Sequence, residues 1–150
     1  RKIAALVLIL SALFLSAASF VISSAPSAPP VTVPYVDIKK YLGLWYEQAV
    51  IPFFWERNCI KSTAGYSLYN NGSIRVEYFG FIQQQMRENG KVAENVGLAV
   101  PEDSTNAKLK VEFVQTLDIG GQYWIVRLAS DYSYSVVSDP DYSHMWILCR

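Results

Sequence analysis

The alternation of apolar and polar residues constrains this chain more than any other feature of its sequence. Between residues 107 and 113 every second residue is apolar and the three between them are charged, and residues 74–78 follow the same pattern. A period of two is that of a half-buried β-strand with one dry and one wet face. We therefore predict an all-β domain from Val36 onward.

Turn signals divide this region into eight segments. Asn71-Gly72 supplies the positive-φ residues of a tight hairpin, and Gly120-Gly121 marks another break. The expected strands are 44–51, 59–69, 73–82, 91–100, 107–114, 123–129, 133–137 and 144–149. Closure into an eight-stranded antiparallel up-and-down barrel would remove exposed edges, and a sandwich of two sheets is the alternative.

The first 25 residues have the pattern of an export signal. Arg1 and Lys2 precede an uncharged apolar run that ends near Ile22, and small residues follow it, as in a cleaved signal peptide. The run almost reaches the ~20 residues that span a bilayer, so an uncleaved anchor is the second interpretation. A Pro/Ser-rich linker (26–35) and one barrel domain (36–150) would follow, secreted or tethered outside the cytosol.

The charge balance argues against a nucleic-acid-binding protein. The 13 Lys and Arg residues equal the 13 Asp and Glu residues in number, so no excess of positive charge favours phosphates. Aromatic residues make up 14% of the chain, which suits both pleated strands and apolar pockets. The composition therefore favours a β-rich fold.

Three segments, in order, resemble the signatures of the lipocalin family. The first is a Gly-x-Trp that opens the first strand, the second an Asp-Tyr before the seventh, and the third an Arg at the end of the eighth. These positions are Gly43, Trp45, Asp131, Tyr132 and Arg150. The local sequences are most similar to those of the branch that contains apolipoprotein D, the bacterial outer-membrane lipocalin and the plant temperature-induced lipocalins.

The resemblance covers residues 36–150 and implies a lipocalin (calycin) barrel around a ligand cavity. It implies that Arg150 lies across the indole of Trp45 at the closed end of the barrel. It also implies a C-terminal helix after the last strand, so we expect this sequence to be a fragment that lacks it. Barrel geometry would place Cys59 and Cys149 at opposite ends, too far apart to bond, and the resemblance implies a partner for Cys59 beyond Arg150.

Alternation from Trp45 predicts which side chains line the lumen. Several are small, which favours an open cavity over a filled core. The predicted lining is Glu47, Ala49, Ala64, Tyr66, Ile74, Val76, Tyr78, Asn95, Gly97, Leu109, Val111, Phe113, Tyr123 and Ile125.

Three consecutive aromatic residues, Phe53, Phe54 and Trp55, follow the first strand. We expect them to cover the ligand or to touch a membrane surface, and a loop that plugs its own barrel is the alternative. Glu56 and Arg57 would keep this loop near water.

Two residues depart from the pattern. Arg127 falls on the inward face, where an unpaired charge is costly, so we favour a β-bulge that turns it to solvent. An ion pair with Glu47 or with a ligand carboxylate is the alternative. His144, the single His of the chain, is expected to face solvent at the start of the last strand.

The sequence predicts a protein that binds and transports a small hydrophobic ligand, such as a fatty acid, lysolipid, sterol or pigment. It predicts no enzyme activity, no cofactor, no metal site and no nucleic-acid partner, because it lacks the corresponding motifs. The alternatives are a lipocalin-fold enzyme, such as an isomerase or de-epoxidase, and a membrane or partner interaction module. Asn71-Gly72-Ser73 is a glycosylation sequon on a predicted hairpin tip.

Overall fold

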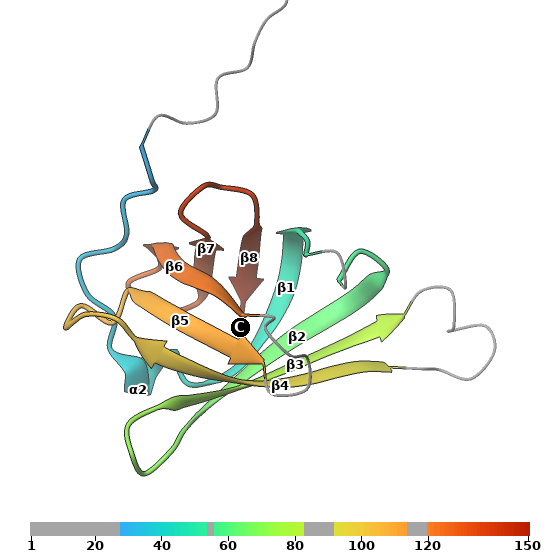
Figure 1. Ribbon diagram of the computed structural model, residues 1–150, viewed down its shortest axis with the longest axis horizontal. Helices are drawn as coiled ribbons and strands as arrows, with labels where there is room; N and C mark the ends of the chain where they lie inside the picture. The colour runs from blue at the N-terminus through green and yellow to red at the C-terminus, as the bar shows by residue number, and fades with distance from the viewer. Residues whose placement is uncertain (1–27, 54–55, 83–91, 114–119) are drawn as a thin grey trace, which may run out of the picture.

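The structure, a computed structural model, describes residues 28–53, 56–82, 92–113 and 120–150. These residues form a closed barrel of eight antiparallel strands, in which each strand pairs with the next and the eighth returns to the first (Figure 1). The predicted eight-stranded up-and-down barrel is confirmed. The predicted signal or anchor segment, residues 1–25, lies outside the described residues.

Within the described residues, a short helix, α2 (Ile38–Tyr41), precedes the barrel. The strands are β1 (Gly43–Ile51), β2 (Cys59–Leu68), β3 (Ile74–Ile82), β4 (Val92–Pro101), β5 (Lys108–Phe113), β6 (Gly120–Leu128), β7 (Tyr134–Ser138) and β8 (Met145–Cys149). Each predicted strand is present, and most bounds agree within one residue.

The start of β6 is the largest difference from the predicted strands. Gly120-Gly121, read from the sequence as a break, forms the first two residues of the strand. A Cβ built at Gly120 would lie 2.5 Å from the carbonyl oxygen of Val111. The glycine therefore allows β6 to approach β5 closely. Close approach of two backbones is a common reason for a Gly inside a strand.

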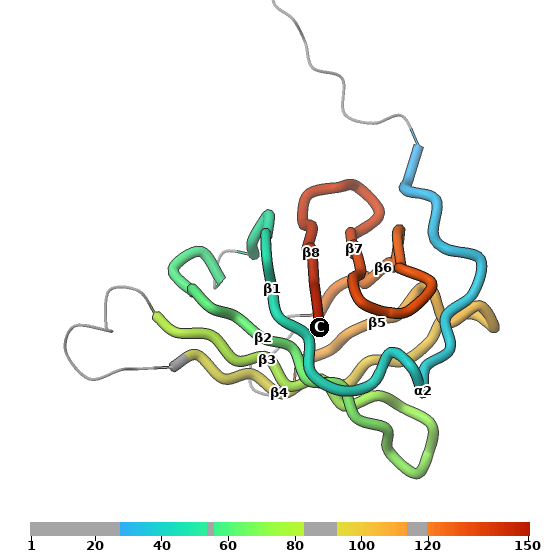
Figure 2. Tube along the Cα trace, turned by 180° about the vertical axis from the view of Figure 1, so that it is seen from behind, coloured from blue at the N-terminus to red at the C-terminus, as the bar shows by residue number. Residues whose placement is uncertain are grey.

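The barrel has two distinct ends (Figures 1 and 2). The last residues of β1, β3, β5 and β7 and the first residues of β2, β4, β6 and β8 lie at one end, which we call the open end. The links β2–β3, β4–β5 and β6–β7 lie at the other, the closed end, together with α2. An extended segment also crosses the closed end, where the Val36 amide donates to the Thr105 carbonyl at 2.8 Å.

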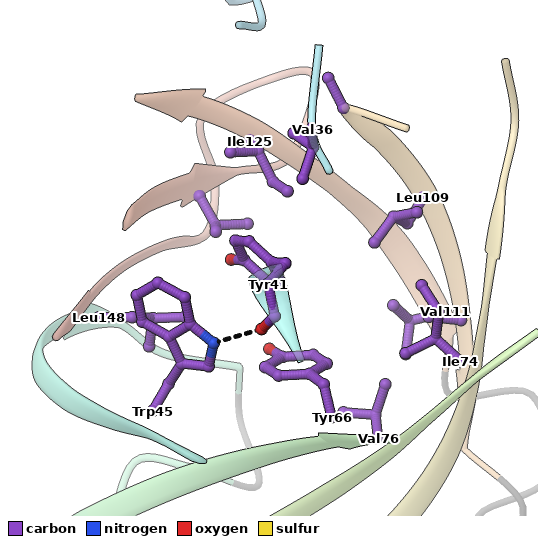
Figure 3. Close-up of a cluster of buried hydrophobic side chains, with 13 residues drawn as sticks. Val36, Tyr41, Trp45, Tyr66, Ile74, Val76, Leu109, Val111, Ile125 and Leu148 are labelled. Atoms are coloured by element: carbon purple, nitrogen blue, oxygen red, sulfur yellow. Dashed lines mark hydrogen bonds between the residues drawn. The ribbon is translucent and has the colours of Figure 1, made fainter. Parts of the chain in front are cut away.

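Trp45 belongs to the core at the closed end, where its indole points toward Tyr41 (Figure 3). It is fully buried, and its indole Nε1 donates to the Tyr41 carbonyl oxygen at 2.8 Å. The Arg150 guanidinium lies 3.9 Å from the centre of the indole ring. It donates to the carbonyl oxygens of Lys40 at 2.7 Å and Leu44 at 3.1 Å. One side chain at the end of the last strand therefore binds the backbone of α2 and of the start of β1.

The other signature residues support the same contact. Gly43 has a φ of 100°, and a Cβ there would lie 3.1 Å from the Arg150 guanidinium, so both backbone and space favour glycine. The Tyr132 hydroxyl accepts from the Asp37 amide at 2.9 Å. Asp131 accepts from the Ser133 amide at 3.1 Å, which shapes the turn before β7.

Three irregularities in strand register change which residues face inward. They lie between Glu47 and Ala49 in β1, between Ile60 and Thr63 in β2, and between Ile125 and Arg127 in β6. The prediction for Ala49 is wrong, because the irregularity in β1 leaves it exposed.

Arg127 follows the favoured interpretation. It is exposed beyond the irregularity in β6, and its guanidinium donates to the Val126 carbonyl oxygen at 3.0 Å. The alternative, an ion pair with Glu47, is not found in the part of the chain that the structure describes.

No disulfide joins Cys59 and Cys149. Tyr46 of β1 pairs with Cys149 of β8 on one side and with Thr63 of β2 on the other. Cys149 and Thr63 therefore lie at the same height along the barrel, two strands apart. Cys59 is four residues further along β2, about 13 Å at ~3.3 Å per residue. This separation is shorter than the sequence estimate but still exceeds the ~7 Å between Cα atoms that a disulfide allows.

Candidate ligand-binding cavity

A cavity lies inside the barrel, above the Trp45 core and toward the open end. About 70 Å³ of it is open to the centre of a water-sized sphere, and about 660 Å³ of empty space lies between its walls when its open side is included. It is lined by Glu47, Phe53, Glu56, Thr63, Ala64, Tyr66, Val76, Val111, Phe113, Gly120, Gly121, Gln122, Tyr123, Trp146 and Leu148. A concave, mainly apolar site with a few polar groups is typical of small-molecule binding.

The cavity brings together eight of the residues predicted to line it. They are Glu47, Phe53, Ala64, Tyr66, Val76, Val111, Phe113 and Tyr123. Several other predicted residues are buried on the inner face but lie outside this lining: Ile74, Tyr78, Asn95, Gly97, Leu109 and Ile125. Phe54 and Trp55 lie outside the described residues.

Sequence reasoning missed the contributions of β8 and of the start of β6. Trp146 and Leu148 line the cavity, and the alternation in the last strand could have identified them, because they lie two residues apart on one face. Gly121 and Gln122 were missed because the two glycines were taken for a turn. Thr63 was missed because strict alternation from Ala64 turns it outward, whereas the irregularity in β2 lies beside it.

A network of tyrosines forms the floor of the cavity. The Tyr123 hydroxyl lies 2.8 Å from that of Tyr66 and 2.9 Å from that of Tyr41, and Tyr41 donates to Ser135 Oγ at 3.0 Å. Burial raises the pKa of Tyr41 to about 12, and it also raises the pKa values of Tyr66 and Tyr123. The floor is therefore neutral at physiological pH, with its hydroxyls bonded to one another.

Aromatic rings line one side of the cavity up to its opening. Phe53 stacks on His144 with 3.6 Å between ring centres, and it lies 5.7 Å from Trp146. Trp146 in turn stacks on Tyr123 at 6.3 Å. Phe53 therefore forms part of the cavity lining, which agrees with its predicted contact with the ligand.

His144 is not simply solvent-facing, as the sequence predicted. Its side chain is 24% exposed, and its Nδ1 lies 2.6 Å from Asp139 Oδ2. Ser143 Oγ lies 3.1 Å from the same Nδ1. Because the carboxylate and the hydroxyl meet the same ring nitrogen, this Ser-His-Asp group lacks the relay geometry of a nucleophilic triad, which uses both nitrogens.

Two carboxyl groups enter the cavity near its opening. Glu56 is only 5% exposed, and its Oε2 accepts from the Phe53 amide at 2.9 Å. The expectation that Glu56 keeps the loop near water is wrong, because the turn folds it inward. Burial, with a smaller contribution from the charge of Glu47, raises the pKa of Glu56 to about 7.

Glu47 comes from β1, opposite the start of β2. Burial raises the pKa of Glu47, and a hydrogen bond with Ser62 opposes that rise. Ser62 Oγ in turn lies 2.8 Å from the Tyr78 hydroxyl. The two carboxyls therefore belong to a polar group of β1, β2 and β3 inside an otherwise apolar lumen.

The cavity lining contains no Lys, Arg or His among the described residues. The described ion pairs of Arg and Lys, Arg75–Glu77 and Lys110–Glu112, join half-exposed or exposed side chains elsewhere on the barrel. The same ranges contain no group of three or more His, Cys, Asp or Glu side chains placed to hold a metal ion. The negative charge of the lumen is thus uncompensated by the described part of the protein.

The fold and the cavity define a class of protein: a single up-and-down barrel with an internal apolar site reached from one end. The family model of the lipocalin-like domain matches residues 36–150. The chain belongs to the lipocalin family, a family known for binding small hydrophobic ligands.

Named relatives support this assignment. Outer membrane lipoprotein Blc of Citrobacter freundii is 36% identical over 138 residues, which cover 90% of this chain and 75% of that protein. Apolipoprotein D of Rattus norvegicus is 41% identical over 122 residues, which cover 79% of this chain and 58% of that protein. The predicted kinship with the apolipoprotein D and Blc branch is confirmed.

Among solved structures, insecticyanin from the tobacco hornworm Manduca sexta superposes with a TM-score of 0.59 at 23% identity. The match covers 84% of this chain and 68% of that one, and it shows the shared barrel. In the ranges that the structure describes, no helix has the length and apolar character needed to cross a membrane.

Proposed function

We propose that this protein binds one small hydrophobic ligand inside the barrel and carries it outside the cytosol. The observation that carries the proposal is the cavity itself, which has apolar and aromatic walls and a neutral tyrosine floor. Burial of a ligand there would remove its apolar surface from water at about 25 cal/mol per Å².

The dimensions of the cavity favour a slender ligand. Only about 70 Å³ admits the centre of a water-sized sphere, so the space suits a ligand of small cross-section. A single hydrocarbon chain, as in a fatty acid or lysolipid, fits such a space better than the fused rings of a sterol. Phe53 and Trp146 would lie along the chain near the opening.

The proposed location outside the cytosol rests on the N-terminal sequence and on one relative. The apolar run after Arg1 and Lys2 has the pattern of an export signal. The relative Blc is named as an outer membrane lipoprotein. Transport, as distinct from binding, would follow from release of the ligand through the open end.

Native mass spectrometry of the purified protein tests the proposal. We expect one bound molecule per chain, released as a hydrocarbon-containing species on denaturation and unchanged after incubation with the protein. An empty barrel that takes up no added fatty acid or fatty alcohol would contradict binding. Chemical conversion of the bound species would instead support the enzyme interpretation.

A further inference from the structure

The strongest unexplained feature of the lumen is its excess of hydrogen-bond acceptors. Glu47 and Glu56 present carboxyl oxygens to the cavity, and no described residue of its lining carries a positive charge. A buried carboxylate without a positive partner is costly, and a protein retains one where something else compensates it.

A third acceptor lies on the inner face of β4, outside the cavity lining itself. Asn95 is only 9% exposed, and its Oδ1 has no hydrogen-bond partner among the described residues. Asn95 pairs across the ladder with Tyr78, whose hydroxyl bonds to Ser62, the partner of Glu47. Buried polar atoms in native proteins normally have a partner, so an unpaired buried acceptor marks a place where a donor is missing.

We infer that the ligand of this cavity is a cationic amphiphile, a slender hydrocarbon chain that ends in a protonated amine held by Glu47 and Glu56. An ammonium group offers three N–H donors and a positive charge, which match the acceptors present. The hydrocarbon chain would extend from the carboxyls toward the Tyr66 and Tyr123 floor. This inference rests on the proposed function and adds the chemistry of the ligand's head.

Other titratable groups face the same region. They are Cys59 and Tyr66 on β2, Tyr78 on β3, Tyr123 on β6 and the His144–Asp139 pair before β8. Burial raises the pKa values of Cys59, Tyr66, Tyr78 and Tyr123, so these groups remain neutral near pH 7. The carboxyls of Glu47 and Glu56 are therefore the groups on the cavity wall whose ionisation an ammonium would favour.

The test is a calorimetric titration of the full chain with decylamine, decanol and decanoate, the two ions below their critical micelle concentrations and decanol below its solubility limit. The three probes share one hydrocarbon chain and differ in the charge of the head. At pH 8 we expect decylamine to bind about tenfold or more tightly than decanol, and decanoate to bind weakest, because a hydrogen bond to a charged group contributes at least that factor.

Variants of the two carboxyls, and buffers of different ionisation enthalpy, identify the groups that cause the preference for decylamine. Glu56→Gln and Glu47→Gln should each remove most of the preference for decylamine while decanol binding stays. Glu112→Gln, on the exposed outer face, should change nothing. Near pH 7 decylamine should release protons on binding, measured from buffers of different ionisation enthalpy, and Glu56→Gln should abolish most of that release.

The outcomes separate the inference from the proposed function. If decanol binds as tightly as decylamine, or decanoate binds best, the cationic head is wrong and the apolar cavity still binds its ligand. If none of the three binds, the proposed function fails and the inference fails with it. Retention of the amine preference in both Glu variants would also overturn the inference.

Discussion

The two ends of the barrel handle buried polar groups in opposite ways. At the closed end, the Trp45 indole, the Tyr41 hydroxyl and the Arg150 guanidinium all find partners within the protein. At the open end, Glu56 is buried and Glu47 is half-buried, and neither has a positive partner among the described residues. The difference indicates that one end is built for stability, whereas the other retains an unfavourable arrangement that a ligand can relieve.

Strand register contributes to this contrast. The irregularities in β1 and β2 lie beside Glu47 and Thr63, on the side of Trp45 toward the open end. Closer to the closed end the β1–β2 ladder is regular from Gly43 to Tyr46. Irregular register commonly re-aims side chains next to a site, and here it accompanies the change from apolar to acidic lining.

The largest expected effect lies at the closed end. Trp45→Ala should lower the free energy of unfolding by about 3–5 kcal/mol, because it empties the centre of the core and removes the surface on which Arg150 stacks. Chemical denaturation measures the change. Trp124→Ala is the control, since Trp124 is only half-buried under Lys108, and it should cost clearly less. Equal costs for the two variants would contradict the special role of Trp45.

The open end should respond in the opposite direction. Glu56→Gln should stabilise the protein above pH 7, because the ordinary pKa of 4.5 rises to about 7 in the folded state. The folded protein then holds more protons than the unfolded chain between these values, so native stability falls as the pH rises from 4.5 to 7. The gap between the variant and the native protein should reach about 3 kcal/mol at about 1.4 kcal/mol per pH unit.

Denaturation curves at pH 4 and pH 8 check this effect. The two proteins should differ little at pH 4, where the carboxyl is neutral in both states. Gln retains an oxygen that accepts from the Phe53 amide, so the loop contact is preserved. A variant that is less stable than the native protein at pH 8 would show that the carboxylate stabilises the open end.

A smaller loss is expected from Arg150→Lys at the closed end. Lys retains the charge but has neither the planar group that covers the indole nor the fork that reaches several carbonyl oxygens. Because the guanidinium is partly exposed, the cost should be about 1–2 kcal/mol. Thermal melts provide the measurement, and ligand binding at the open end should stay unchanged. A melting temperature identical to that of the native protein would show that the Arg150 guanidinium does not contribute to stability.

The smallest effect concerns Asn71, on the hairpin between β2 and β3 at the closed end. Asn71 is exposed, and its Oδ1 accepts from the Ser73 amide at 3.1 Å. In a eukaryotic host we predict partial glycosylation there, detected as a glycosidase-sensitive shift in gel mobility that is absent in Asn71→Gln. Since the site lies at the end opposite the cavity opening, removal of the glycan should not alter ligand binding.

The regular parts of the molecule could be predicted from the sequence. Period-two patterning placed the strands, and it predicted that Val76 and Val111 would face the cavity. These features depend on local alternation, which each strand carries by itself. The contact between Arg150 and Trp45 was expected from the resemblance to the lipocalin family, because it joins residues far apart in the sequence.

The open end was harder to predict because its geometry depends on irregularities. An irregular register in β1 turned Ala49 outward, against strict alternation. The inward turn of Glu56 follows from a loop contact with the Phe53 amide, which no periodicity describes. Gly121 lines the cavity because β6 begins earlier than its glycines indicate.

The most direct test of a ligand site at the open end uses two glycines. A Cβ at Gly121 would meet only Phe53 Cζ at 3.4 Å, so Gly121→Leu should fold and place its side chain in the cavity. Gly65→Leu is the matched control, because a Cβ there lies 3.8 Å from Glu77 on the outer face. Calorimetric titration with decanol should show one site in the native protein and in Gly65→Leu and no binding in Gly121→Leu, with similar melting temperatures. Undiminished binding by a folded Gly121→Leu protein would contradict the cavity as the ligand site.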